Sequence, residues 1–125
     1  MNHKSALHTF LEGIRDEVPL LLAVIPFGVI YGIVALEAGL TKLQAQSMSY
    51  IVFGGSSQFV ASKLIAEAVP ASLIVLTVAV VNLRHMLYSA SVAPYVQDLP
   101  FRWKALLAYL LTDEAYAVVI NYYQR

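Results

Sequence analysis

The sequence predicts an all-α, polytopic helical membrane protein with about four transmembrane segments, at least one of them a discontinuous helix. Of its 125 residues, 59% are hydrophobic and only 13% are charged, and the mean hydropathy is +0.68. A soluble domain is about 45–50% apolar and about 25% charged. Several apolar stretches approach the ~20 residues needed for a helical crossing. Polar residues interrupt these stretches, and this is unusual for a passive membrane anchor.

Composition also excludes several functional classes. The formal net charge is zero, so no basic surface is available to neutralise nucleic-acid phosphates. The chain has no cysteine, which excludes disulfides and thiolate chemistry. We find no nucleophile with a spaced base, no phosphate-binding loop and no metal-ligand spacing. The sequence therefore predicts neither an enzyme nor a resident metal or cofactor.

Residues 1–17 are expected to form an amphipathic segment that lies at the membrane interface. Apolar side chains recur there at helical spacing, while acidic and basic residues occupy the other faces. No continuous apolar stretch of a cleavable signal peptide is present. The alternative is that this helix packs on the neighbouring spans.

The membrane domain is expected over residues 18–125, with spans over about 18–37, 43–66, 70–95 and 103–122. Pro26 and Gly28 should kink the first span. The second contains FGGSSQF, which favours two half-helices or a bend, and non-helical backbone is expected over 54–57. Pro70 suits the first turn of the third span.

The basic residues are distributed almost evenly between the two sides of the membrane. Four full crossings would place Lys63 on the N-terminal side, and Lys42, Arg102 and Lys104 on the other. If residues 43–66 are instead re-entrant, Arg102 and Lys104 rejoin the side of Arg15. We expect a cytoplasmic N-terminus.

Three groups of polar residues are candidate sites. The first, residues 54–58, resembles an unwound transporter helix that binds polar substrate atoms, although small residues also permit close helix packing. The second has Asn82 and His85 on one helical stripe and Arg84 on the next, which favours the wall of a substrate or proton route. Alternatively, the third span ends near Val81, and the side chains of Arg84 and His85 reach the headgroups.

The third group is the acidic pair Asp113 and Glu114, near the middle of the fourth expected span. Adjacent helical positions point about 100° apart, so the two carboxylates should have different surroundings. We expect one acid to pair with a base, Arg84 being the best candidate, and the other to line a cavity. The alternative is a purely structural ion pair.

Four stretches of the chain resemble, in order, the N-terminal portion of the AzlC family: PLLLAVIPFGVIYGIVALEAGL, FGGSSQFVA, VNLRHMLYSASVAPY and LLTDEAYAV. The resemblance implies the large subunit of an exporter of branched-chain amino acids (leucine, isoleucine and valine). It also implies the plasma (inner) membrane of a prokaryote, a multi-pass topology and a small AzlD-type membrane subunit. Family members are roughly twice this length, so the chain resembles half of a longer transporter.

Within that resemblance, we interpret the polar residues as two sets. The expected substrate-binding residues are Gly55, Ser56, Ser57, Gln58, Asn82 and Arg84, and the expected proton-coupling residues are His85, Asp113 and Glu114. The partners would be branched-chain amino acids, the AzlD-type subunit, the lipid bilayer and possible further copies of the chain. The alternatives are a small multidrug-type dimeric exporter and an accessory membrane subunit without transport activity.

Overall fold

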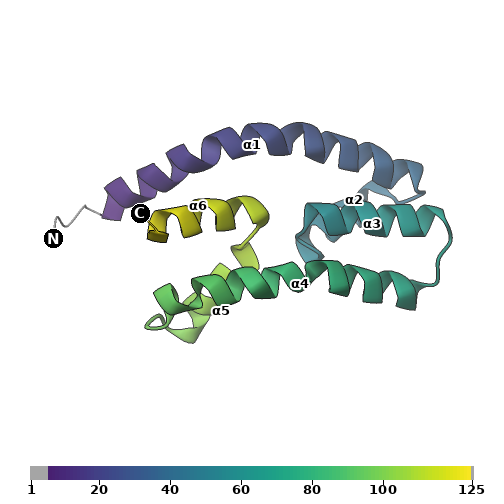
Figure 1. Cartoon of the computed structure of the whole chain (residues 1–125). Helices are drawn as coiled ribbons and strands as arrows, with labels where there is room; N and C mark the ends of the chain where they lie inside the picture. The colour runs from purple at the N-terminus through teal and green to yellow at the C-terminus, as the bar shows by residue number, and fades with distance from the viewer. Residues whose placement is uncertain (1–5, 125) are drawn as a thin grey trace. The chain divides into compact units, whose positions relative to one another are not determined.

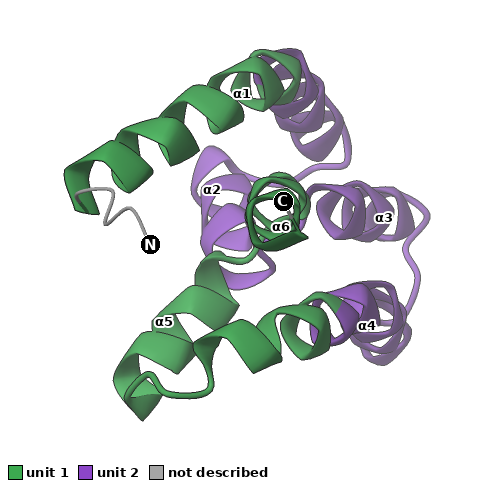
Figure 2. Cartoon of the chain, turned by 60° about the vertical axis from the view of Figure 1, so that its left-hand side comes forward, with its two compact units in different colours: residues 1–24, 88–125 green, residues 25–87 purple. Residues whose placement is uncertain are grey.

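The computed structural model describes residues 6–124, and every regular element in that range is an α-helix (Figure 1). The six described helices are α1 (Ala6–Glu37), α2 (Lys42–Ile51), α3 (Gly55–Ala66), α4 (Ala71–Val96), α5 (Phe101–Leu110) and α6 (Asp113–Gln124). The all-α prediction is confirmed. Figure 2 shows two compact units, residues 25–87 and residues 1–24 with 88–125, and each is described by itself below.

Only α1 and α4 among the described helices are long and apolar enough to cross a membrane. Their most apolar 18-residue windows have mean hydropathies of 2.4 and 1.6. The other four helices have 10 or 12 residues each. At about 1.5 Å per residue they are roughly 15–18 Å long, about half the hydrocarbon thickness. The segments expected over 43–66 and 103–122 are therefore each two half-length helices.

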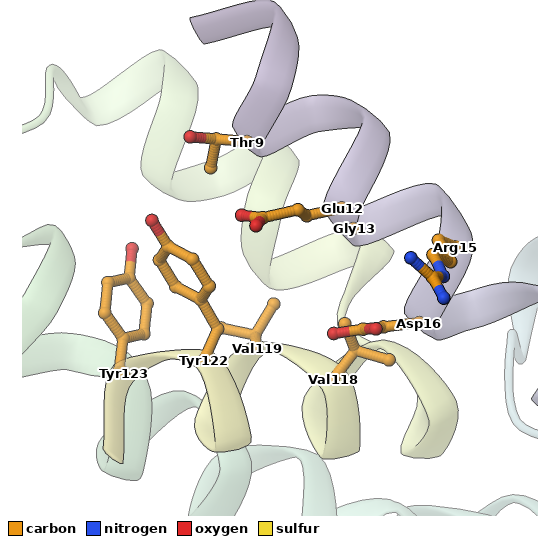
Figure 3. Close-up of a pocket in the computed structure, with 9 residues that line it drawn as sticks. All are labelled: Thr9, Glu12, Gly13, Arg15, Asp16, Val118, Val119, Tyr122 and Tyr123. Atoms are coloured by element: carbon orange, nitrogen blue, oxygen red, sulfur yellow. The ribbon is translucent and has the colours of Figure 1, made fainter. Parts of the chain in front are cut away.

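The N-terminal segment is helical from Ala6 and continues without interruption into the first expected span. The part of the segment before Ala6 lies outside the described residues. Figure 3 shows a pocket within the unit of residues 1–24 and 88–125, where Glu12, Arg15 and Asp16 of α1 lie opposite Val118 and Tyr122 of α6. The apolar side chains of the segment are exposed, with Leu7 at 66% and Phe10 at 65%, and its position at the membrane interface stays a prediction.

In the unit of residues 25–87, α2 turns back along α1. The Tyr31 hydroxyl, two turns before the end of α1, donates a 2.9 Å hydrogen bond to the Ala45 carbonyl in the first turns of α2. Tyr31, Ala35 and Ala45 form a buried cluster. Thr41 starts α2 with a capping box, in which its side chain accepts from Gln44 N and the Gln44 side chain accepts from Thr41 N. The two helices are antiparallel.

Helix α3 then runs parallel to α1. The Phe27 ring of α1 lies against Gly55 of α3. One turn further along both helices, Tyr31 makes an edge contact with Phe59. Helix α3 is in turn antiparallel to α4. Gly54 lies beside Asn82 and His85, and Ser57, further along α3, reaches back to Asn82. Helices α2 and α3 therefore form a hairpin between two longer helices.

In the unit of residues 1–24 and 88–125, two tyrosine stacks join α4 to α6. Tyr88 stacks on Tyr116 and Tyr95 stacks on Tyr123, each with ring centroids 4.3 Å apart. Both pairs advance by two turns in the same direction, so α4 and α6 are parallel. Helix α6 therefore starts beside the part of α4 near Tyr88. Because α4 ends at Val96, α5 has to lead the chain back by about 15 Å along the α4 axis.

The break at Leu111 and Thr112 was not expected from the sequence. The Thr112 hydroxyl accepts a 3.3 Å hydrogen bond from Ala115 N, and the Thr112 carbonyl accepts one of 2.9 Å from Tyr116 N. Threonine is a favoured residue at the start of a helix, and acidic residues in the first turn complement the helix dipole. Asp113 and Glu114 occupy that first turn.

Candidate functional site

The best candidate site lies at the break between α2 and α3, in the unit of residues 25–87. Helix α2 ends at Ile51 and α3 begins at Gly55. Phe53 between them has a φ of 47°, in the left-handed region that costs roughly 1–2 kcal/mol for a residue with a side chain. The interruption expected over 54–57 is thus present over 52–54, and the residues from Gly55 onward already belong to the first turn of α3.

Close approach by α4 explains the glycine at the N-cap of α3. A Cβ atom on Gly54 would lie 3.0 Å from Asn82 Oδ1 and 3.3 Å from His85 Cε1. Gly54 has an extended backbone and provides no side-chain cap for α3. The first N–H groups of a helix have no partner within the helix itself and carry its positive dipole end. An anionic group is therefore favoured at this end of α3.

Hydrogen bonds link this break to the middle of α4. The Ser57 hydroxyl donates to Asn82 Oδ1, and Asn82 Nδ2 donates to the Val52 carbonyl at 3.5 Å. His85 Nδ1 lies 3.3 Å from the Asn82 carbonyl, which can only accept, so this contact requires the proton on Nδ1. On the α2 side, Gln58 Nε2 donates to Ser49 Oγ at 2.8 Å.

The burial pattern around this cluster is inverted relative to a water-soluble protein. Ser57 is 0% exposed and Gln58 is 8% exposed, whereas Ile51 and Leu87 are 80% and 71% exposed. Polar side chains thus face other helices, and large apolar side chains face outward. Helices in a bilayer have this arrangement, because lipid solvates apolar side chains and small or polar residues mediate helix contacts.

An aromatic cluster covers the amino end of α3. The Phe27 ring packs edge-on against Phe59, with centroids 4.8 Å apart, and a Cβ atom on Gly55 would overlap the Phe27 ring. Phe27 follows Pro26 in α1. The site is therefore built from α1, α2, α3 and α4, with hydrogen-bonding groups on one side and aromatic rings on another.

The structure separates the expected site residues into three groups. Gly55, Ser57, Gln58, Asn82 and His85 lie together around the break. The Ser56 side chain is exposed, and Arg84 is half-buried on α4 in the same unit. Asp113 and Glu114 are half-buried in the first turn of α6, in the other unit. The expected pairing of one acid with Arg84 stays a prediction.

Sequence reasoning missed Ser49, Ser62 and Phe27. Ser49 lies one turn before the break, and its hydroxyl also donates to the Ala45 carbonyl at 3.4 Å. Ser62 follows Gln58 by one turn, is 0% exposed, and has no hydrogen-bond partner for its hydroxyl within residues 6–124. The spacing of Gln58 and Ser62 along one face of α3 was the signal that would have identified Ser62.

Comparison with known proteins fits this arrangement. The family model described as AzlC protein matches residues 19–125. The chain is 34% identical to the inner membrane protein YgaZ of Escherichia coli over 110 residues, which cover 87% of this chain and 45% of that protein. It is 32% identical to an uncharacterized membrane protein of Archaeoglobus fulgidus, covering 94% of this chain and 51% of that protein.

A third relative carries a functional name. The chain is 28% identical to the branched-chain amino acid transport protein AzlC of Bacillus subtilis, over 98% of this chain and 47% of that protein. The chain thus spans about half the length of these curated relatives. No solved structure matches it. With a family match over residues 19–125, this chain belongs to the AzlC family of membrane proteins.

Proposed function

We propose that the chain forms part of an exporter of branched-chain amino acids in the inner membrane of a prokaryote. The observation that carries the proposal is the buried, hydrogen-bonded cluster of Ser57, Gln58 and Asn82 at a helix break. Broken helices at mid-membrane are where many transporters bind polar substrates. The name of the Bacillus subtilis relative supports the choice of amino acids as substrate.

The chemistry of the break suits the polar head of an amino acid. The uncapped amino end of α3 favours a carboxylate, and Arg84, on α4 in the same unit, would supply a positive charge. The amides of Gln58 and Asn82 both accept and donate hydrogen bonds. Phe27 and Phe59 offer an apolar surface for an aliphatic side chain. This combination would select a small zwitterion with an apolar side chain.

Transport would proceed by alternating access and be coupled to protons. Residues His85, Asp113 and Glu114 would carry the coupling, because each is an ionisable group within an apolar helical segment. A small AzlD-type membrane subunit would complete the transporter. These assignments rest on the family and on residue chemistry.

Efflux from cells lacking their own exporters tests the proposal. The full reading frame that contains this chain, with its AzlD-type partner, should release preloaded leucine, isoleucine and valine. Gln58→Ala should lower the efflux rate at limiting substrate by about tenfold or more, since stranding a buried polar partner costs ~1–3 kcal/mol. The matched control is Gln46→Ala, because Gln46 is an exposed glutamine on α2.

The outcomes separate the competing functions. Equal efflux from the Gln58→Ala and Gln46→Ala proteins, at equal membrane yield, would remove the α2–α3 break from the binding site. Efflux of lipophilic cations in place of leucine would favour the small multidrug-type alternative. No efflux of either class, with both subunits in the membrane, would favour an accessory subunit.

A further inference from the structure

The order and length of the helices repeat along the chain. Helix α1 is followed by half-length helices of 10 and 12 residues, and α4 is followed by half-length helices of the same two lengths. Each pair of half-helices is separated by a short break, at residues 52–54 and at Leu111 and Thr112. The residues themselves show no evident repeat, so the similarity lies in the architecture.

The helix directions repeat as well. In the first set, α2 returns along α1 and α3 runs parallel to α1, as the contacts of Tyr31 with Ala45 and Phe59 establish. In the second set, α6 runs parallel to α4 through the stacks of Tyr88 on Tyr116 and Tyr95 on Tyr123, and α5, which comes between them in the chain, leads back to the start of α6. Each set thus consists of one long helix followed by a hairpin of two half-length helices. The first half-length helix is antiparallel to the long helix, and the second is parallel to it.

The two sets have opposite directions. Helix α3 is antiparallel to α4 (Figure 1), because Gly54 lies beside both Asn82 and His85, and Ser57, further along α3, reaches only the earlier of the two, Asn82. Since α1 is parallel to α3, α1 and α4 are also antiparallel within the unit of residues 25–87. A bilayer crossed by α1 in one direction is therefore crossed by α4 in the other.

We infer that the chain consists of two inverted-topology repeats, α1–α3 and α4–α6, each made of one complete crossing and one re-entrant hairpin. The α2–α3 hairpin enters from the side where α1 ends and returns to it. The α5–α6 hairpin enters from the side where α4 ends and returns to that side. The hairpin arms are roughly 15–18 Å long, so each hairpin tip lies near the middle of a ~30 Å hydrocarbon layer.

Both hairpin tips carry polar residues. The first tip holds Gly54 and the buried Ser57, and the second holds Thr112, Asp113 and Glu114. Inverted repeats with broken helices at mid-membrane are the arrangement in which many secondary transporters switch access from one side to the other. In this protein, each polar tip would be connected by its own hairpin to a different side of the membrane.

This topology also resolves the distribution of basic residues. The ends of α2 and α3 place Lys42 and Lys63 together on one side. Arg102 and Lys104 lie in the first turn of α5, directly after the end of α4, and are therefore on the other side, which is also the side of Arg15 toward the start of α1. The positive-inside rule makes the side of Arg15, Arg102 and Lys104 cytoplasmic.

Native lysines provide the test, because the repeat model and four full crossings group them differently. A membrane-impermeant amine reagent applied to spheroplasts should label Lys42 and Lys63, and should label Lys104 only after permeabilisation. Four full crossings would instead group Lys42 with Lys104 and separate both from Lys63. The proposal would be overturned if one of Lys42 and Lys63 were labelled in intact spheroplasts and the other only after permeabilisation. Labelling of Lys104 alone would retain the repeats and reverse the orientation.

Single cysteines give a second, independent measurement in a chain that has none of its own. Glu37→Cys and Glu67→Cys replace exposed residues at the ends of α1 and α3, and both should react with an impermeant maleimide in spheroplasts. Asp98→Cys and Gln124→Cys, after α4 and at the end of α6, should both react only after permeabilisation. Opposite labelling of Glu37→Cys and Glu67→Cys would overturn the α2–α3 hairpin. Both experiments measure topology, so their outcome does not depend on the substrate proposed above.

Discussion

Ser57 and Asn82 share a hydrogen bond that ties the first turn of α3 to the middle of α4. The Ser57 side chain is fully buried, and Asn82 also donates to the carbonyl of Val52, just before the left-handed residue Phe53. One asparagine therefore holds both sides of the break between α2 and α3. Any movement that opens the break has to exchange these hydrogen bonds for others.

Asn82→Ala should destabilise the protein in detergent. Interhelical hydrogen bonds in membrane proteins contribute on average about 0.6 kcal/mol and up to about 1.7 kcal/mol, and this substitution removes two. We expect a lower midpoint of thermal unfolding than for Asn121→Ala, whose exposed side chain donates a 2.7 Å hydrogen bond to the Ala117 carbonyl of its own helix. A double-mutant cycle with Ser57→Ala should show coupling. Additive effects of the two substitutions would contradict a direct role for the pair.

Gly55→Ala should lower stability through a steric conflict with Phe27. The added methyl group would overlap the Phe27 ring, and an overpacked contact typically costs about 1–3 kcal/mol. Gly28→Ala is the matched control, because a Cβ atom at Gly28 would have no atom of another helix within 4 Å. The control should be neutral or slightly stabilising, since alanine favours helix more than glycine does. If Phe27→Leu fails to reduce the cost of Gly55→Ala, the conflict lies elsewhere.

The fold class was predictable from composition, and one of the two helix breaks was predictable from local sequence. FGGSSQF contains residues that form helices poorly, and the interruption occurs there, although at residues 52–54. The second break lies in an apolar stretch and was missed, because Asp113 and Glu114 were interpreted by their charge alone and Thr112 was not considered with them. The same residues are a helix-start signal. Hydropathy cannot distinguish one crossing from two half-length helices in a hairpin.

The candidate site was predictable by residue type and only partly by geometry. Asn82 and Gln58 were expected from their position in apolar stretches, and both make hydrogen bonds to other helices. The partner Ser49 and the covering ring of Phe27 were not expected, since they come from helices whose pairing with α3 depends on the hairpin. Ser56 was expected in the site because it lies between Gly55 and Ser57 in the sequence. In the helix, however, its side chain is exposed.

Tyr116 should contribute to the α4–α6 contact mainly through its ring. The ring stacks on Tyr88 with an interplanar angle of 11°, and the hydroxyl donates a 3.1 Å hydrogen bond to Ser91. Aromatic pairs are worth about 0.5–1.5 kcal/mol beyond their burial. Tyr116→Phe should therefore keep most of the thermal stability, and Tyr116→Leu should lose more. Equal losses in the two variants would assign the contribution to the hydroxyl.

The two acids at the start of α6 should separate in a transport assay. Adjacent positions on a helix point about 100° apart, so Asp113 and Glu114 have different surroundings and only one is expected to carry the coupled proton. Replacing that acid, as Asp113→Asn or Glu114→Gln, should abolish efflux driven by a pH gradient and leave exchange of labelled for unlabelled leucine running. The charge-matched control is Asp98→Asn, an exposed acid after the end of α4, which should leave both activities unchanged. Gradient-driven efflux that survives both substitutions at normal yield would show that the acids stabilise the start of α6 without moving protons. Loss of exchange together with efflux would place the acid in substrate binding instead of coupling.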